Sequence, residues 1–177
     1  HIVEELVAKK KENGLVLFLV PSLSLLSQTV TEWKNDSNVD FHAFAVCSDS
    51  QIGIRKKSDD LGDMESHDLA FPATTKSGTL AQKVKQHNKE QLTVVFATYH
   101  SIQVLSDAQK HDELRDFDLI ICDEAHRTTG ATLAGEEESK FVAVHSQDFI
   151  RADKRLYMTA TPRIFSPDVK VKASEAD

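Results

Sequence analysis

Short apolar runs of strand length recur along the chain and are separated by helical patterns. The predicted strands cover residues 15–20, 41–47, 92–97, 117–122 and 155–158. Apolar positions three or four residues apart predict helices over residues 2–11, 25–33, 80–90, 102–114 and 141–150. Strands that alternate with helices predict an α/β fold, with a mainly parallel sheet and helices on both faces.

One segment breaks this alternation. Residues 48–78 are dominated by polar, charged and turn-forming side chains. A connection of this length is uncommon in a compact domain. We assign it no regular structure beyond a short helix.

Composition narrows the class of protein. The 177 residues are 40% hydrophobic and 28% charged, which is typical of one globular domain. The longest apolar run, residues 15–20, is too short to cross a bilayer. Cys47 and Cys122 lie in apolar stretches and predict buried, reduced thiols in a cytoplasmic protein. The net charge of −7 is not that of a protein that binds nucleic acid through charge alone.

The strand predicted over residues 117–122 runs directly into Asp123 and Glu124, and then into Ala125 and His126. In open α/β sheets, ligands bind beyond the carboxyl ends of the strands. The first carboxylate can hold Mg²⁺, directly or through water, and the second can polarise a water molecule. The alternative is that the acidic pair only caps a following helix.

Hydroxyl and amide side chains follow three other predicted strands. They are Ser22 and Gln28 after the first, Thr98 and Ser101 after the third, and Thr159 and Thr161 after the last. Such groups beside a helix start can bind phosphate oxygens. Each of them alone is better explained as part of a cap or a turn.

Together these segments resemble the first RecA-like motor domain of superfamily two helicases and translocases, the DEAD/DEAH-box group. Residues 119–126 look like motif II, residues 158–162 like motif III, residues 20–29 like motif Ia and residues 97–101 like motif Ib. The resemblance covers residues 1–165 and is greatest to the helicase-type ATPases of DNA restriction systems. It implies a three-layer fold of the P-loop NTPase type, with ATP and Mg²⁺ as cofactors.

The resemblance also implies a role for each residue. Asp123 would hold Mg²⁺ through water, and Glu124 would activate the water that attacks the γ-phosphate of ATP. His126 would link the nucleotide to Thr159 and Thr161. The residues expected to contact the nucleic-acid backbone are Pro21, Ser22, Gln28, Thr98 and Ser101.

The chain departs from the family pattern in two places. Many relatives carry an Arg-Glu pair where this chain has Leu23 and Ser24. No G-x-x-x-x-G-K-[ST] loop is present, and the glycines with that spacing, at 130 and 135, precede three glutamates that would repel phosphate. We therefore expect the phosphate-binding loop to lie upstream of His1, and this chain alone to be inactive as an ATPase. Residues 1–165 would be a partial ATP-binding domain, and residues 166–177 a tail or linker toward a second motor domain.

Three other functions are alternatives to this one. A non-catalytic RecA-like module that binds nucleic acid or a protein is the main alternative. A zinc site lacks suitably spaced ligands, and a two-metal nuclease or phosphatase lacks a second carboxylate cluster. The expected partners are nucleic acid, DNA rather than RNA, and a second RecA-like domain of the same protein. We expect a monomer that does not bind membranes.

Overall fold

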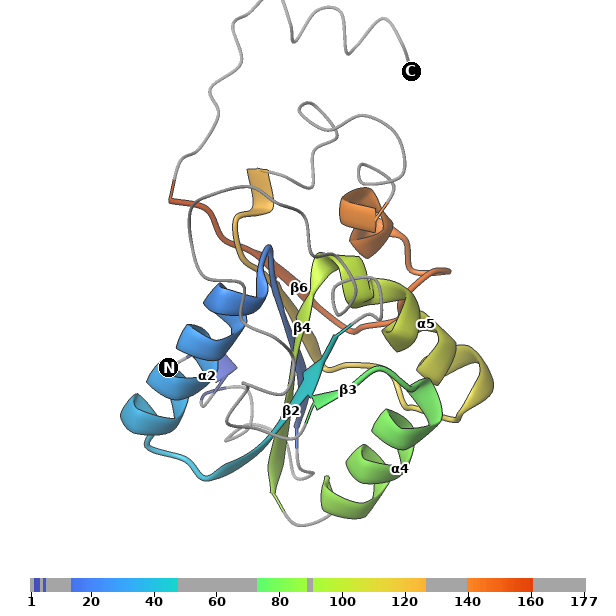
Figure 1. The fold of residues 1–177 in the computed structure, drawn as a ribbon, viewed down its shortest axis with the longest axis horizontal. Coiled ribbons are helices and arrows are strands. Elements are labelled where there is room, and N and C mark those ends of the chain that lie inside the picture. Colours follow the sequence, from blue (N-terminus) through green and yellow to red (C-terminus); the bar gives the residue numbers. More distant parts are fainter. Residues whose placement is uncertain are drawn as a thin grey trace, which may run out of the picture.

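The computed structural model describes residues 2, 3, 5, 14–47, 73–88, 91–126 and 140–160. These residues form a six-stranded parallel sheet in the order β3-β2-β4-β1-β5-β6 (Figure 1). The strands are β1 (Leu15–Val20), β2 (Phe41–Val46), β3 (Ala73–Thr74), β4 (Leu92–Thr98), β5 (Leu119–Cys122) and β6 (Arg155–Tyr157). The α-helices are α2 (Leu23–Asp36), α4 (Ser77–His87) and α5 (Ile102–His111).

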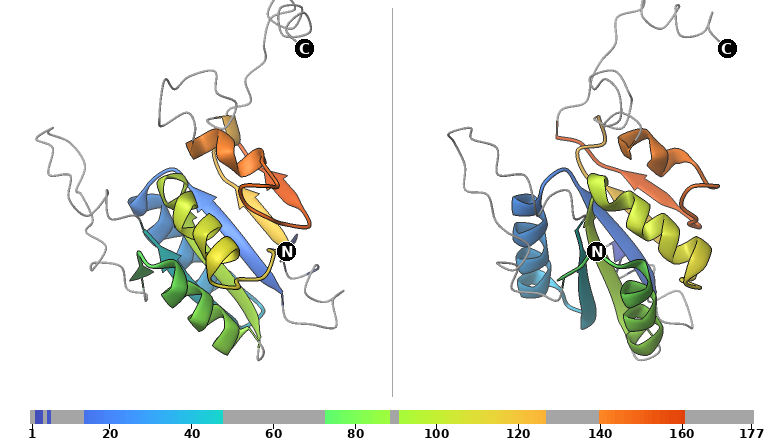
Figure 2. Two further views of the ribbon diagram at one scale, coloured as in Figure 1. Left: turned by 90° about the vertical axis from the view of Figure 1, so that its right-hand side faces the viewer. Right: turned by 45° about the vertical axis from the view of Figure 1, so that its right-hand side comes forward.

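The helices cover both faces of the sheet, as predicted. Helix α2 lies on one face, and α4 and α5 lie on the other (Figure 2). Alternate residues of β1 enter the two cores: Leu17 and Leu19 pack on the α4 and α5 side, and Val16 and Phe18 on the α2 side. Strands buried on both faces explain why the sequence shows unbroken apolar runs here.

Helix α2 begins at Leu23, two residues before the predicted start, and ends at Asp36, beyond the predicted end. The Ser22 hydroxyl accepts a hydrogen bond from the Leu25 amide (3.3 Å), which makes Ser22 the N-cap. On the covered side of the helix, Leu26 and Val30 are buried. Trp33 meets Phe18 edge to face, with ring centroids 5.1 Å apart.

The prediction that residues 48–78 form no regular structure beyond a short helix was wrong for the last residues of this segment. Ala73–Thr74 forms the edge strand β3, and α4 begins at Ser77 rather than at residue 80. A strand of two residues is too short to show a periodicity. The N-cap of α4, Lys76, makes no capping bond through its side chain, so the helix start carries no local signal. Residues 48–72 lie outside the described part of the chain.

The helix predicted over residues 141–150, before β6, is shorter in the structure. Residues 140–142 are helical, and a 3₁₀ turn follows at Ala143–His145. The Arg155 guanidinium fixes this segment to β6 because it donates to the Val144 carbonyl (2.8 Å), the Gln147 side chain (2.7 Å) and the Ile150 carbonyl (2.6 Å). Helix α5 also ends earlier than expected, so that Leu114 lies beyond it.

Cys47 and Cys122 are buried and unbridged, as predicted. Burial raises the pKa of the Cys122 thiol to about 12, so it stays protonated. Among the described residues, no helix has the length and apolar character needed to cross a membrane.

Candidate functional site

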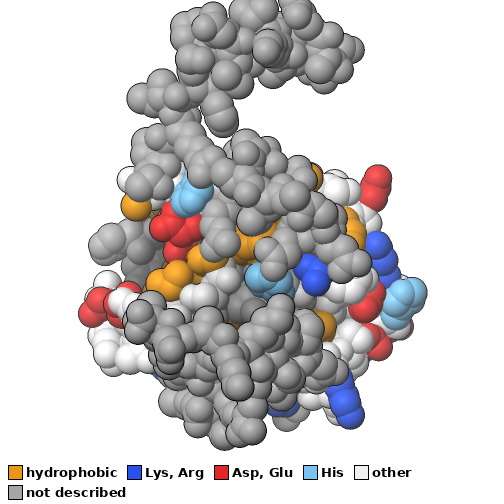
Figure 3. Space-filling view, turned by 45° about the horizontal axis from the view of Figure 1, so that its top comes forward, with side chains coloured by type: hydrophobic (Ala, Val, Ile, Leu, Met, Phe, Trp, Pro, Cys, Tyr) orange, Lys and Arg blue, Asp and Glu red, His pale blue; other side chains and the backbone are white. Residues whose placement is uncertain are grey.

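The carboxyl ends of four neighbouring strands meet at one edge of the sheet. In the strand register, Val20 pairs with Thr98, Leu19 with Cys122, and Cys122 with Tyr157. The polar residues that follow β1, β4, β5 and β6 are therefore brought together, as the sequence predicted. Seen with the top of Figure 1 turned forward, acidic side chains gather beside a histidine and border a strip of hydrophobic ones (Figure 3).

The residues that follow β5, Asp123–His126, form the acidic turn. The Asp123 carboxylate contacts the backbone of the next residue, because its Oδ1 accepts a hydrogen bond from the Glu124 amide (2.9 Å). Glu124 has a φ of 51°, in the left-handed region that few non-glycine residues adopt. Such backbone conformations persist only where surrounding contacts enforce them, and they are frequent at functional sites.

Three neighbouring segments enforce the backbone of the acidic turn. The Asp123 amide donates to the Leu19 carbonyl of β1 (2.9 Å), and the Ala125 amide donates to the Met158 carbonyl after β6 (2.8 Å). The Tyr99 hydroxyl, just after β4, donates to the Asp123 carbonyl (2.8 Å). The conformation of the turn is thus set by tertiary contacts.

His126 joins the acidic turn to the end of β6. Its Nδ1 lies 3.1 Å from Thr159 Oγ1 and also 3.1 Å from Glu124 Oε2. One ring nitrogen carries at most one hydrogen, so the two contacts compete for it. The structure thus brings together three of the predicted residues, Glu124, His126 and Thr159. Thr161 lies outside the described residues.

The residues that follow β1, Pro21–Ser24, form the serine turn, which lies partly in solvent. The Ser22 and Ser24 hydroxyls are 3.1 Å apart. One helical turn later, the exposed Gln28 donates from its side-chain amide to Glu32 (2.8 Å). Of the residues predicted here to contact nucleic acid, Pro21 and Ser22 are half-buried and Gln28 is exposed, so each can reach a ligand.

Thr98 and Ser101, also predicted to contact nucleic acid, are fully buried. Their hydroxyl oxygens lie 2.9 Å apart and bond to each other. A direct contact between either hydroxyl and a ligand therefore requires the turn after β4 to open. In the conformation described, this pair braces the turn that carries Tyr99.

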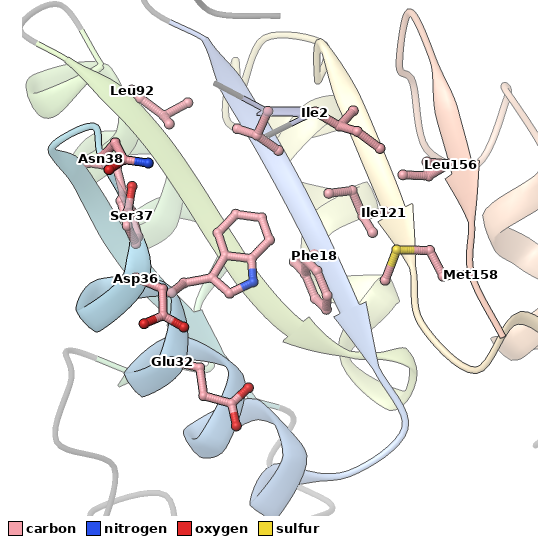
Figure 4. A pocket seen from close by; sticks show the side chains of 13 residues that line it. Ile2, Phe18, Glu32, Asp36, Ser37, Asn38, Leu92, Ile121, Leu156 and Met158 are labelled. Atoms are coloured by element: carbon pink, nitrogen blue, oxygen red, sulfur yellow. The ribbon is translucent and has the colours of Figure 1, made fainter. Parts of the chain in front are cut away.

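A cavity of about 530 Å³ lies on the α2 face of the sheet. Phe18, Ile121 and Leu156 project into it from the strands, and Glu32 and Asp36 lie at the side of α2 (Figure 4). Apolar walls with a carboxylate border do not suit phosphate, which carboxylates repel. Phosphate binding is better matched by the carboxyl edge of the sheet.

The acidic turn offers the donors for a hard cation held through water. Asp123 presents a carboxylate beside the sheet edge, with one oxygen oriented by the Glu124 amide. No group of three or more His, Cys, Asp or Glu in the described residues could hold a metal ion by itself. A single carboxylate fits Mg²⁺, which keeps most of its waters and is commonly shared with substrate phosphates.

Residues 1–164 match the family described as Type III restriction enzyme, res subunit. The chain belongs to this family. The match confirms the resemblance drawn from the motifs. Among curated proteins, the chain is 30% identical over 165 residues to a protein of African swine fever virus described as a probable helicase. The alignment covers 93% of this chain and 16% of the viral protein.

Two solved structures share the fold. One is described as the ATP-dependent Type ISP restriction-modification enzyme LlaBIII bound to DNA, with a TM-score of 0.78 and 40% identity. The other is a nuclease-deletion mutant of the Type ISP enzyme LlaGI in complex with a DNA substrate mimic, with a TM-score of 0.70 and 38% identity. Each alignment covers 93% of this chain, but only 10% and 14% of the respective solved chains. The RecA-like fold is therefore confirmed, and the chain spans a small part of its relatives' length.

Sequence reasoning missed the residues that hold the acidic turn. Leu19 and Met158 contribute backbone carbonyls, which no side-chain pattern reveals. Tyr99 lies inside the segment that resembles motif Ib, between the two residues expected to contact nucleic acid. Its position in that segment was the available signal.

Proposed function

We propose that this chain is part of the first motor domain of an ATP-dependent DNA translocase or helicase of a restriction-modification system. The observation that carries the proposal is the acidic turn at the carboxyl edge of the sheet. There, His126 Nδ1 lies 3.1 Å from both Glu124 Oε2 and Thr159 Oγ1. Membership of the res-subunit family supports the same function.

In this proposal Asp123 would hold Mg²⁺ through water. Its Oδ1 is fixed by the Glu124 amide, so the carboxylate has a defined direction before any ligand arrives. Mg²⁺ bound with ATP would neutralise charge on the phosphate oxygens. Phosphoryl transfer depends mostly on such positioning and charge, so few protein groups are required.

Glu124 is the proposed base that accepts a proton from the attacking water. Its carboxylate lies 3.1 Å from His126 Nδ1, and one third of the side chain is exposed. The Oε2 atom that faces His126 is buried and makes no hydrogen bond to a described residue, while the exposed part of the side chain is reached by solvent. A base of this kind typically contributes 10²- to 10⁴-fold to a rate.

His126 and Thr159 are the proposed coupling residues, together with Thr161. Because Nδ1 of His126 contacts both Glu124 and Thr159, a change at either contact alters the other. A displacement of the strand end that carries Thr159 would therefore change the environment of the base. Through the same contacts, a change in the bound nucleotide at Glu124 would displace the strand end that carries Thr159.

DNA is the proposed track. Both solved relatives are described as complexes with DNA or a DNA mimic. Pro21, Ser22 and Gln28 would contact the phosphate backbone from the open serine turn and α2, which gives binding without sequence readout. Thr98 and Ser101 would join them only after the buried turn that follows β4 opens.

The proposed domain limits are residues 1–165 for the partial ATP-binding domain and 166–177 for a linker to a second motor domain. The phosphate-binding loop would lie upstream of His1 in the full-length protein. Relatives several times longer than this chain support that arrangement. The 177-residue chain alone would not hydrolyse ATP.

Mg²⁺-dependent ATP hydrolysis by the full-length protein, with and without DNA, tests the proposal. Glu124→Gln should lower turnover at least about 100-fold, because the amide cannot accept the proton. Glu113→Gln is the matched control. Glu113 also has a positive φ, 59°, but its side chain is 85% exposed and lies beside Lys85. Parental turnover in Glu124→Gln would show that Glu124 is not the base, whereas a full-length protein without ATP turnover would favour the non-catalytic binding module.

A further inference from the structure

Tyr99 is a fully buried tyrosine whose hydroxyl reaches the candidate site. It lies in the 3₁₀ turn Tyr99–Ser101 that follows β4, and its ring stacks on Phe141 with centroids 4.5 Å apart. A phenylalanine would fill the same space and keep the stacking. The hydroxyl must therefore be explained by its polar contacts, which are with the Asp123 carbonyl and the Cys122 thiol.

The first of these contacts lies on the acidic turn. The hydroxyl donates to the Asp123 carbonyl (2.8 Å), which belongs to the peptide group between Asp123 and Glu124. The orientation of this peptide group defines the φ of Glu124, which has the unusual value of 51°. The bond thus acts on the backbone of the proposed base.

The other hydrogen bonds that hold the acidic turn do not replace the bond from Tyr99. The Asp123 amide is held by Leu19, and the Ala125 amide is held by Met158. Both of these hydrogen bonds lie outside the peptide group that joins Asp123 to Glu124. Among the described residues, the Tyr99 hydroxyl donates the hydrogen bond to the carbonyl of this peptide group, and the amide of the same group donates to the Asp123 side chain.

We propose that Tyr99 is a positioning residue, which fixes the Asp123–Glu124 peptide group and so aims the Glu124 carboxylate at its water. This inference rests on the function proposed above. Because Tyr99 follows directly on β4, it also connects the acidic turn to the braced pair Thr98 and Ser101. If nucleic acid opened that turn, the orientation of the Asp123–Glu124 peptide group, and with it the position of the Glu124 carboxylate, would change.

The Tyr99 hydroxyl can keep its hydrogen bond to the Asp123 carbonyl at any working pH. Burial raises the pKa of Tyr99 far above its ordinary value, so the group remains a donor at every working pH. The bond therefore responds to movement of the turn after β4, and not to protonation. A misplacement of a reacting group by an ångström can cost up to about a hundredfold in rate.

The test is Tyr99→Phe in the full-length protein, with ATP turnover measured at saturating DNA and normalised to bound nucleotide. Tyr157→Phe is the control. It removes a hydroxyl at the end of β6 that lies 2.9 Å from His145 Nδ1; Tyr157 pairs with Cys122 of β5, but its hydroxyl bonds His145 and not the backbone of the acidic turn. We expect Tyr99→Phe to lower kcat roughly tenfold with KM for ATP unchanged. The control should retain the parental kcat and KM.

Each other outcome has one meaning. If Tyr99→Phe keeps the parental kcat, the hydroxyl does not position the base and the inference is overturned. If turnover falls only in proportion to bound nucleotide, Tyr99 supports the fold alone, and the inference is again overturned. If the parental protein itself is inert with ATP and DNA, the proposed function fails, and this inference fails with it.

Discussion

The acidic turn and the serine turn both follow parallel strands at the same edge of the sheet, yet they are held in different ways. The acidic turn, Asp123–His126, is bonded to the ends of β1, β4 and β6. Within the described part of the chain, the hydrogen bonds of the serine turn, Pro21–Ser24, are made within the turn and with the first turn of α2. The first is fixed by tertiary structure, and the second by local sequence.

This difference fits two tasks. A group that activates water must stay within a fraction of an ångström of its reacting position, so contacts from several elements suit it. A group that follows a DNA backbone without reading sequence gains from a more open setting. We therefore expect substitutions at the acidic turn to affect turnover, and those at the serine turn to affect local stability and binding.

The largest effect outside the proposed base should come from His126→Ala in the full-length protein. The substitution removes the contact between the acidic turn and Thr159. Coupling between sites is commonly worth about 5- to 150-fold, and we expect the ratio of DNA-stimulated to basal ATP turnover to fall roughly tenfold, within that range. His145→Ala, which removes an exposed bond to Tyr157, is the control. An unchanged ratio in His126→Ala would show that the acidic turn is not coupled through His126.

A smaller effect is expected for Ser101→Ala, which tests the buried brace after β4. Thr98 would lose its hydroxyl partner inside the core, at a cost of about 1–2 kcal/mol in the free energy of unfolding. Urea unfolding of the 177-residue chain, followed by the fluorescence of its single tryptophan, Trp33, measures this cost. Thr98→Val should cost a similar amount, because it breaks the same bond. A neutral result for both would mean that the brace does not hold the turn.

The smallest effect should come from Ser22→Ala in the serine turn. Loss of an N-cap costs typically about 1 kcal/mol, and the same unfolding measurement applies. Ser24→Ala is the matched control, because Ser24 is exposed and does not cap the helix; it should change stability by less than about 0.5 kcal/mol. Equal costs at the two serines would show that Ser22 does not act as the cap.

The same contrast explains what could be predicted from the sequence. The strands β1, β4 and β5 are apolar runs with both faces buried, and the Ser22 cap is a local signal, so each was visible in the residues themselves. The acidic pair was visible for the same reason, because it directly follows a buried strand.

Features that depend on distant partners were not visible. Strand β3 exists because Ala73 and Thr74 pair with β2, and nothing in two residues indicates such pairing. Likewise, the burial of Thr98 and Ser101 could not be read from a motif that only suggests contact with a ligand. The role of Tyr99 depends on a hydrogen bond across 24 residues.

The measurement that tests the central claim most directly is ATP turnover by the full-length protein with Mg²⁺ and DNA, beside the 177-residue chain. We predict that the full-length protein hydrolyses ATP and is stimulated by DNA, while the chain alone is silent because it lacks the phosphate-binding loop. A full-length protein that is inert with both DNA and RNA would contradict the claim, and the acidic turn would then be part of a binding module.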